Sequence, residues 1–275
     1  MTWPEYLALI LSMVFGFGGM EWFTAHFDLR RPNFQGKRIP AALGLAFVLS
    51  GEFFYGAEWL LQGLHTSLAA VYFLVTIGFG GLGLLDDWIG DRRVGGFRGH
   101  FQQLAKGRLT TGAAKALGGG LVSLVAGYLI TAPHPLGYAL VAALLIVLSA
   151  NTLNLLDLRP GRCLFGFFIG AATVFVFLLG QHSLLSGLLL WAAAAAALVL
   201  LPLDAGGAGM LGDTGSNSLG AVLGVAGAIF FPLSWQIVLV AVLLLFQIWC
   251  ERYSLSRVIE NTPWLRFLDR KIGVR

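Results

Sequence analysis

Long apolar stretches separated by short polar segments dominate this 275-residue chain. An apolar helix needs about 20 residues to cross a bilayer, and nine stretches have roughly that length. They cover approximately residues 5–26, 41–61, 66–85, 113–131, 135–151, 163–180, 183–203, 217–233 and 235–251. The pattern therefore predicts an all-α fold, a polytopic bundle of about nine transmembrane helices in a single domain spanning residues 1–275.

Two acidic residues, Glu52 and Glu58, interrupt the second stretch. One interpretation has Glu58 reaching the outer membrane edge while Glu52 forms hydrogen bonds inside the bundle. The other assigns them to a proton or ion path, because acids inside a membrane are often functional. The sequence leaves both interpretations open.

Composition agrees with a membrane protein. Hydrophobic residues make up 57% of the chain and charged residues only 12%, against about 25% charged in soluble domains. The mean hydropathy is +0.79. The 37 glycines suit close helix contacts in lipid. Cys163 and Cys250 provide no disulfide framework and are interpreted as core thiols.

The basic residues predict the orientation. All 18 lysines and arginines lie in four segments, at residues 30–38, 92–115, 159–162 and 252–275. Cytoplasmic loops carry the excess of such residues, so the N-terminus is expected outside and the C-terminus in the cytoplasm. This clustering beside the spans argues against a nucleic-acid partner for the net charge of +4.

Function is expected on the cytoplasmic face, where the longer loops lie. These loops are 27–40, 86–112, 152–162 and 204–216, followed by the tail 252–275. Within the tail, residues 254–269 are predicted either as an interfacial amphipathic segment broken at Pro263 or as a plain basic anchor. The first stretch lacks the basic start and cleavage site of a signal peptide.

Asp86 and Asp87 end the third predicted helix. A helix C-terminus carries partial negative charge, so two adjacent carboxylates there need a compensating cation. Arg92 and Arg93 are one candidate source. A divalent metal is the other, since Mg²⁺ favours one or two carboxylates together with substrate phosphates.

Two further polar motifs stand at the same predicted membrane edge. Asn151, Asn154 and Asp157 recur every three residues and share a broad helix face, suited either to a nucleotide or metal shell or to helix capping. Residues 203–216 combine glycines with Asp213 before the eighth stretch. Such a helix start attracts phosphate and places Asp213 for a metal; the alternative is a flexible loop capped by Ser216 or Asn217.

Together these motifs resemble the polyprenyl-phosphate N-acetylhexosamine-1-phosphate transferases, the superfamily that includes the phospho-MurNAc-pentapeptide translocases. Five segments occur in the family's order over much of the chain. They are Pro32-Asn33 to Gly44 with Lys37 and Pro40, Gly83-Leu84-Leu85-Asp86-Asp87, Thr111-Gly112-x-x-Lys115, Asn151-x-x-Asn154-Leu155-x-Asp157, and Leu211-Gly212-Asp213-Thr214-Gly215-Ser216.

The resemblance implies that a polyprenyl phosphate attacks the β-phosphate of a UDP-N-acetylhexosamine and releases UMP. It implies Mg²⁺, or Mn²⁺ in its place, at Asp213 with Asp86 and Asp87, which would also deprotonate or orient the lipid phosphate. Lys115 would neutralise phosphate charge. The nucleotide and phosphate contacts would come from Lys37, Asn151, Asn154, Asp157, Arg159, Arg162, Gly212, Thr214 and Ser216.

The chain departs from the family pattern in four places. Pro160 stands where an acid is expected to read the uracil edge, and Met210 stands where an aromatic often precedes the metal motif. The family's histidine-rich last cytoplasmic loop and its final span have no counterpart. The departures alter the nucleobase and sugar half of the expected site, where Arg159 and Arg162 are candidates for replacement phosphate or carboxylate contacts.

Three functions follow as hypotheses. The first is an active Mg²⁺-dependent sugar-1-phosphate transferase in the plasma membrane of a prokaryote, possible as a homodimer, with its site facing the cytoplasm. The second is a non-enzymatic relative that binds lipid phosphate or a partner enzyme. The third is a transporter that uses Glu52 and the acidic clusters.

Overall fold

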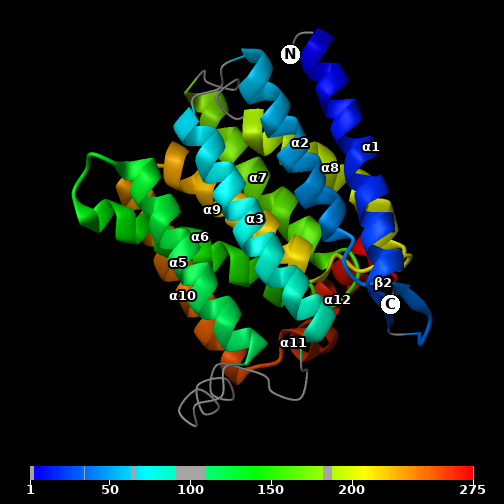
Figure 1. Cartoon of the computed structure of the whole chain (residues 1–275). Helices are drawn as coiled ribbons and strands as arrows, with labels where there is room; N and C mark the ends of the chain where they lie inside the picture. Colours follow the sequence, from blue (N-terminus) through cyan, green and yellow to red (C-terminus); the bar gives the residue numbers. More distant parts are fainter. Residues whose placement is uncertain (1–2, 34, 63–65, 91–109, 182–187, 275) are drawn as a thin grey trace.

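The computed structural model describes residues 3–33, 35–62, 66–90, 110–181 and 188–274. Within these residues the chain forms eleven helices and one two-stranded sheet (Figure 1). The elements are α1 (Trp3–His26), β1 (Arg30–Pro32), β2 (Arg38–Pro40), α2 (Gly44–Gln62), α3 (Thr66–Ile89), α5 (Thr111–Thr131), α6 (Leu136–Leu156), α7 (Arg162–Gly180), α8 (Leu188–Ala205), α9 (Gly212–Phe230), α10 (Leu233–Arg252), α11 (Leu255–Asn261) and α12 (Pro263–Ile272).

In the described part of the chain, every apolar stretch of the sequence overlaps one of these helices. Six helices in the described part of the chain are long and apolar enough to cross a membrane: α1, α3, α5, α6, α7 and α10. The described apolar parts of α2 and α8 are shorter, at Gly44–Ala57 and Leu190–Ala205. The chain therefore has the character of a multi-pass helical membrane protein.

Helix ends differ from the predicted ones where the polar motifs lie. α3 continues past Asp86 and Asp87 to Ile89, α6 continues past Asn154 to Leu156, and α9 begins at Gly212 instead of residue 217. These motifs were expected in loops or at loop edges; they occupy terminal helical turns. The physical reason is that a continued helix pairs backbone groups internally, which matters most near a membrane.

Strands β1 and β2 form a β-hairpin within residues 27–40, where a loop was expected. β1 and β2 pair antiparallel, with Arg31 opposite Ile39. The side chain of Asn33 accepts hydrogen bonds from the backbone N–H groups of Gln35 and Lys37, and Gly36 has a φ of +80°. An asparagine that caps its own turn and a glycine at positive φ together reverse the chain sharply.

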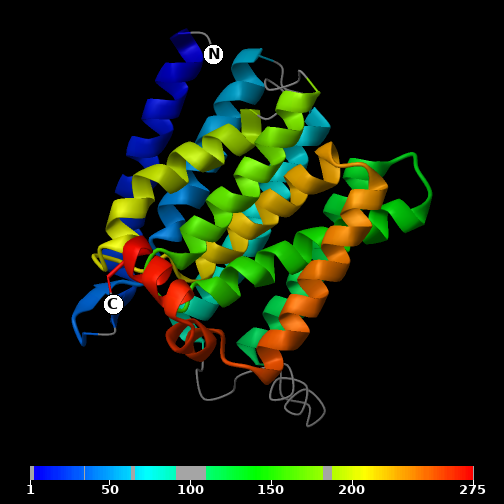
Figure 2. The same ribbon diagram turned by 180° about the vertical axis from the view of Figure 1, so that it is seen from behind.

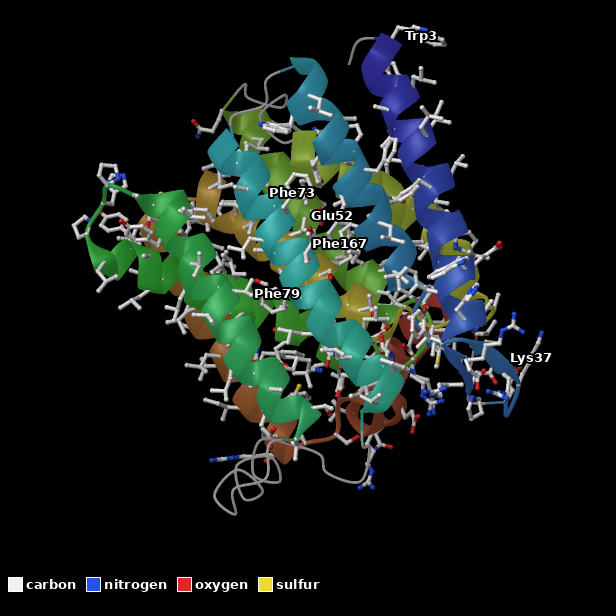
Figure 3. The ribbon with its side chains drawn as sticks, in the orientation of Figure 1. Trp3, Lys37, Glu52, Phe73, Phe79 and Phe167 are labelled. Carbon is white, nitrogen blue, oxygen red and sulfur yellow. The ribbon has the colours of Figure 1, made fainter. Side chains whose placement is uncertain are left out.

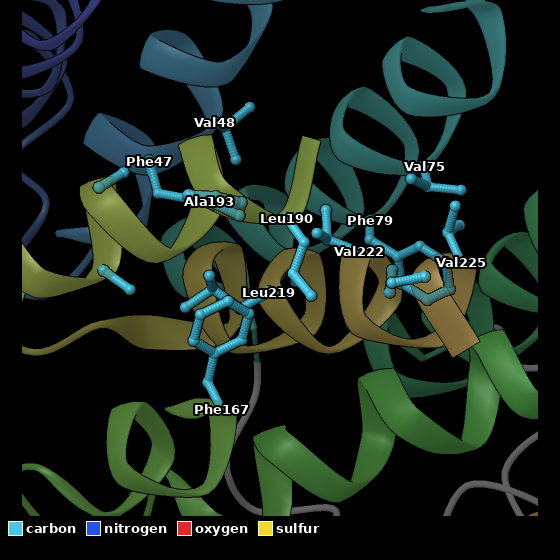
Figure 4. Close-up of a cluster of buried hydrophobic side chains, with 14 of the residues drawn as sticks. Phe47, Val48, Val75, Phe79, Phe167, Leu190, Ala193, Leu219, Val222 and Val225 are labelled. Carbon is cyan, nitrogen blue, oxygen red and sulfur yellow. The ribbon is translucent and has the colours of Figure 1, made fainter. Parts of the chain in front are cut away.

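Helix α9 lies at the centre of the bundle, in contact with α2, α3, α6 and α7 (Figures 1 and 2). Fourteen of its 19 residues are buried. Figure 4 shows Leu219, Val222 and Val225 of α9 among side chains from α2, α3, α7 and α8. Because α9 contacts other helices on most sides and little lipid, it can carry small and polar residues at positions where a lipid-exposed helix would need large apolar ones.

Glycines allow the closest of these contacts. A Cβ atom at Gly220 would lie 2.5 Å from the carbonyl oxygen of Ser149, and one at Gly224 would lie 2.6 Å from the Cα of Ile146. The two glycines are four residues apart on one face, which is the small-xxx-small spacing of tightly packed membrane helices. This packing fixes α9 against α6 and so fixes the polar ends of both helices.

Glu52 lies inside the bundle on α2 (Figure 3). Its Oε1 atom accepts a hydrogen bond from the hydroxyl of Thr76 on α3, and among the described residues its Oε2 atom has no partner. This contact agrees with the interpretation of Glu52 as a hydrogen-bonding acid within the bundle. The side chain of Glu58 lies outside the described residues.

Candidate functional site

Four helices bring one basic and two acidic side chains and an amide together at the end of the bundle. The Lys115 Nζ atom of α5 forms an ion pair with Asp213 of α9 and lies 3.6 Å from the Asp86 Oδ2 atom of α3. The carboxyl groups of Asp86 and Asp213 are also within hydrogen-bonding reach of each other. Asn154 of α6 donates a hydrogen bond of 2.7 Å to the Asp213 Oδ1 atom.

Asp87 has a different position from its neighbour. Its Oδ1 atom accepts the backbone N–H of Asp213 at 2.9 Å, and its Oδ2 atom accepts the backbone N–H and the hydroxyl of Thr214 at 2.9 and 2.6 Å. Asp87 therefore caps the N-terminus of α9 from another helix. A carboxylate is favourable there because unpaired N–H groups give a helix start partial positive charge.

These contacts resolve the electrostatic problem at the end of α3. The charge of Asp87 is met by the start of α9, and that of Asp86 is shared with Lys115. Arg92 and Arg93, one expected source of compensation, lie outside the described residues. Compensation within the described part of the chain thus comes from α9 and α5.

Two glycines allow the backbones to come this close. A Cβ atom at Gly83 of α3 would lie 2.4 Å from the carbonyl oxygen of Asp213. Gly212 has a φ of +73°, and a Cβ atom there would lie 2.7 Å from the Asp87 Oδ2 atom. Any other residue at position 212 would be strained by both the backbone angle and the contact.

The start of α9 is held by further polar contacts. Asn154 donates a second hydrogen bond, of 3.0 Å, to the hydroxyl oxygen of Ser216. The Asn217 amide donates to the backbone carbonyl of Asp213 at 2.7 Å. Because Asn154 contacts both Asp213 and Ser216, the end of α6 fixes the Asp213 carboxylate.

A cavity of about 560 Å³ opens beside this cluster. Its polar lining includes Asp86, Asp87, Lys115, Asn154 and Asp213. Its apolar lining includes Phe79, Ala116, Val147, Leu148 and Leu155, and α10 contributes Gln247, Cys250 and Glu251. Phe79, labelled in Figure 3, precedes the acidic pair on α3 by about two helical turns. The cavity therefore joins a charged end to an apolar one, which suits an amphiphilic ligand.

A second acidic pair lies next to the Gly212 backbone. Burial raises the pKa of the Asp157 carboxyl well above its ordinary value; the charges of Asp204, Asp213 and Asp87 raise it further, and a hydrogen bond from the Gly212 backbone opposes them. Asp204 is buried, and its Oδ2 atom accepts the backbone N–H of Gly161 at 2.8 Å. Asp157 thus lies within electrostatic reach of three other carboxyl groups, and their repulsion favours either a retained proton or a bound cation at this end of the bundle.

The donor atoms fit Mg²⁺ only in a limited way. Within the described residues, no three His, Cys, Asp or Glu side chains are grouped as a metal site. Asp86 and Asp213 offer two carboxylates beside the cavity, and Mg²⁺ is commonly held by one or two carboxylates plus substrate phosphates. The residues therefore fit a metal that arrives with a phosphorylated ligand, and they do not form an all-protein cage.

Several of the residues expected to contact nucleotide or phosphate lie elsewhere or have other partners. Asp157, Gly212, Thr214 and Ser216 are not among the residues that line the cavity. Lys37 is exposed at the tip of the hairpin, away from the bundle (Figure 3). The Asn151 amide donates to the Gln247 Oε1 atom at 3.0 Å, which ties α6 to α10, although Asn151 still lines the cavity. Arg159 lies 3.7 Å from Glu260 of α11. Arg162 is buried in a two-pronged ion pair with Asp269 of α12.

Sequence reasoning assigned no site role to four residues that the structure places here. Thr111 forms a hydrogen bond with the Asp86 side chain, Asn217 supports Asp213, Gln247 lines the cavity, and Asp204 faces Asp157. Gln247 carried a usable signal, since it is an amide within an apolar helix. Thr111, Asp204 and Asn217 lie within or beside the quoted motifs.

The fold and the site together define a multi-pass helical membrane protein with a charged, partly apolar cavity at one end of its bundle. No protein-family model and no curated protein matches the chain.

Proposed function

We propose that the chain transfers a sugar-1-phosphate from a nucleotide sugar to a polyprenyl phosphate, with release of a nucleoside monophosphate. The observation that carries this proposal is the meeting of Asp86, Lys115, Asn154 and Asp213 from four helices at one cavity. The Lys115 ammonium group can bind the phosphate of a phosphorylated lipid, and the apolar part of the cavity can bind its hydrocarbon chain.

The polar residues of the cavity have separate roles in the proposed reaction. Lys115 neutralises phosphate oxygens that enter beside it, and Asn154 keeps the Asp213 carboxylate in place. Asp86 is the residue best placed to accept a proton from, or orient, the attacking lipid phosphate, because it lines the cavity while Asp87 caps α9 and Asp213 is held by Lys115 and Asn154. Mg²⁺, when bound with the substrate, supplies charge stabilisation to the transferring phosphoryl group. Asp87 positions α9 and so positions Asp213.

The apolar half of the cavity suits the first isoprene units of the acceptor. Phe79, Val147 and Leu148 line it between α3 and α6. The same proposal includes the topology. The chain crosses a prokaryotic plasma membrane nine times, its N-terminus lies outside the cell, and the cavity faces the cytoplasm. The four basic segments at one end of the spans support this orientation.

The donor half of the site differs from the resembling family. Arg162 is committed to Asp269, so Arg159 is the better placed of the two arginines to meet a donor phosphate. Pro160 supplies no side-chain acceptor for a base edge. We therefore propose a nucleotide sugar as the donor class and leave the identity of its base to experiment.

The test is a reaction of the purified protein in detergent with undecaprenyl phosphate, Mg²⁺ and a panel of nucleotide sugars. Release of nucleoside monophosphate that requires lipid and metal, and that the Asp213→Ala variant loses, is the expected result. Glu21→Ala, which changes an exposed acid on α1, is the matched control and retains activity. An absence of release from every donor contradicts the proposal.

One observation favours a second function. Lys115 already fills the gap between Asp86 and Asp213, as a resident cation would in a protein that only binds a lipid phosphate. Such a non-catalytic relative would bind undecaprenyl phosphate without releasing any nucleotide. Binding of the lipid that persists without Mg²⁺ and is lost in Lys115→Met would favour it.

A further inference from the structure

Helix α12 presents three chemically distinct faces. At 100° per residue, Leu265, Asp269 and Ile272 fall on one side, and these are its more buried residues. Trp264, Phe267 and Leu268 fall together on a second side, with exposed fractions of 62%, 62% and 46%. The third side carries the exposed Arg266 and Arg270.

The buried face of α12 is fixed by specific contacts. Asp269 receives hydrogen bonds from the Nε and Nη2 atoms of Arg162 at 2.5 and 2.9 Å, and both side chains are nearly inaccessible to solvent. After α12 ends, the backbone N–H of Val274 donates to the carbonyl of Ala205 at 2.9 Å. Because these contacts set the rotation of the helix, the aromatic side cannot turn toward the bundle.

The preceding chain fixes the height of α12 relative to the membrane. α10 is one of the six candidate membrane spans and ends at Arg252, and α11 begins at Leu255. The two residues between them can cover only about 7 Å. The start of α11 therefore lies close to the end of α10, and the Arg162–Asp269 ion pair holds α12 at the first residue of α7, another candidate span (Figure 2).

We propose that α12 is seated in the headgroup region of the adjoining leaflet and binds anionic lipids. Trp264, Phe267 and Leu268 enter the acyl boundary, while Arg266, Arg270 and Lys271 meet the lipid phosphates. Lys271 falls on the aromatic side too, in the last turn of α12; its Nζ atom lies over the ring of Phe267, 5.8 Å from the centroid, and its long stem allows the charge to reach the headgroups. The proposal requires that α10 crosses the membrane, and it does not require the transferase function.

The chemistry of this surface selects a bilayer over a protein partner. Tryptophan and phenylalanine flanked by arginine and lysine are typical of helices that lie in a membrane interface. Each basic residue near an anionic leaflet contributes about 1 kcal/mol of attraction. The described part of α12 carries three basic residues outside its buried face and one acid, Asp269, which is already paired.

The contact has a consequence for the loop beside the acidic cluster. Arg162 follows Gly161, whose backbone N–H binds Asp204, and Asp204 faces Asp157. A Cβ atom at Gly161 would lie 2.8 Å from the carbonyl oxygen of Ile272, so the end of α12 packs directly on this loop. Seating α12 on the leaflet therefore holds the loop at residues 158–161 in place.

Site-directed spin labelling tests the proposal. In a Cys163→Ala, Cys250→Ser background, a nitroxide is attached to Phe267→Cys or, as the matched control on the basic side, to Arg266→Cys. The protein is reconstituted as single copies in nanodiscs of phosphatidylcholine with or without phosphatidylglycerol. Accessibility to lipid-soluble oxygen relative to an aqueous nickel chelate is expected to be several-fold higher at 267 than at 266, and higher still with phosphatidylglycerol.

Two further results decide the alternatives. Replacing both Arg266 and Arg270 by glutamine, with the label at 267, is expected to remove the phosphatidylglycerol effect while the Arg162–Asp269 contact preserves the fold. Equal exposure of both labels to the nickel chelate in every lipid would overturn the proposal. Protection of the label at position 267 from the nickel chelate that appears only with two copies per nanodisc would also overturn the proposal. It would show that a second copy of the chain covers this surface.

Discussion

At the scale of single residues, Asp86 and Asp87 show how neighbours in sequence acquire different roles. Successive side chains on a helix point about 100° apart, so the two carboxylates have different partners although both line the cavity, and Asp86 is the one beside Lys115. The other faces the start of α9 and accepts three hydrogen bonds from Asp213 and Thr214. The pair thus combines a group available for chemistry with a group that holds the structure.

Exchanging each aspartate for asparagine separates these roles. Asp87→Asn sets an amide N–H₂ against the N–H groups of α9, and we expect it to lower the free energy of unfolding by about 1–3 kcal/mol. Asp86→Asn is expected to lower transferase turnover with a smaller effect on stability. Thermal unfolding in detergent and the nucleotide-release assay measure the two effects; equal melting temperatures for the two variants would contradict the division.

The charge of Lys115 determines how strongly Asp86 and Asp213 attract an added cation. With Lys115→Met, the carboxylates of Asp86 and Asp213 lose the charge that lies between them. Added Mg²⁺ is then expected to raise the melting temperature of the variant more than that of the wild type, because the metal replaces the missing charge. Lys271→Met, on the exposed side of α12, is the control and should respond like the wild type.

At the scale of elements, the site depends on backbones that approach closely. The polar start of α9 packs against α3 at Gly83, and its middle packs against α6 at Gly220 and Gly224. Side chains larger than hydrogen at these contacts would separate the helices that carry Asp87, Asp213 and Asn154. Glycine in this bundle therefore acts on the geometry of the charged cluster.

Two glycines on α3 give a matched test of this dependence. A Cβ atom at Gly83 would meet the backbone of Asp213 and Thr214 within 2.5 Å, whereas at Gly81 it would meet nothing within 4 Å. Gly83→Ala is expected to cost about 1–3 kcal/mol of stability through overpacking. Gly81→Ala should be neutral or slightly stabilising, since alanine favours a helix. Similar melting temperatures for the two variants would show that α3 and α9 are further apart.

At the scale of the whole molecule, polar and charged groups gather at one end of an apolar bundle. The hairpin, the cluster around Asp213, and helices α11 and α12 all lie toward the end at which α3 and α10 finish (Figures 1 and 2). A protein with this asymmetry is expected to meet its water-soluble substrates from one side only.

Labelling with a membrane-impermeant maleimide tests the sidedness. In the cysteine-free background, Lys37→Cys on the hairpin and His134→Cys in the turn between α5 and α6 present thiols at opposite ends of the bundle. His134→Cys is expected to react in intact bacterial cells, and Lys37→Cys only in inverted vesicles. The reverse pattern would place the cavity outside the cytoplasm.

The fold was largely predictable because its helices are set by local sequence. Each apolar stretch became a helix, and the turn residues Asn33 and Gly36 carried the signal for the hairpin that was expected only as a loop. Helix ends were misplaced at the polar motifs, where hydropathy falls although the helix continues. Hydropathy measures the preference of a segment for lipid. It therefore underestimates the length of α9, which is buried among other helices.

The sequence by itself determined that the chain is a helical membrane protein and which residues carry its charge, because hydrophobic length and motif composition are local properties. Only the tertiary structure decided the pairings. Arg162 looked free for a substrate phosphate, yet it is paired with Asp269, 107 positions away. Asp87 was expected beside a metal, and the structure adds a second role, because its oxygens cap α9. Such partners depend on how helices pack, and that is set by side-chain shape along many contacts at once.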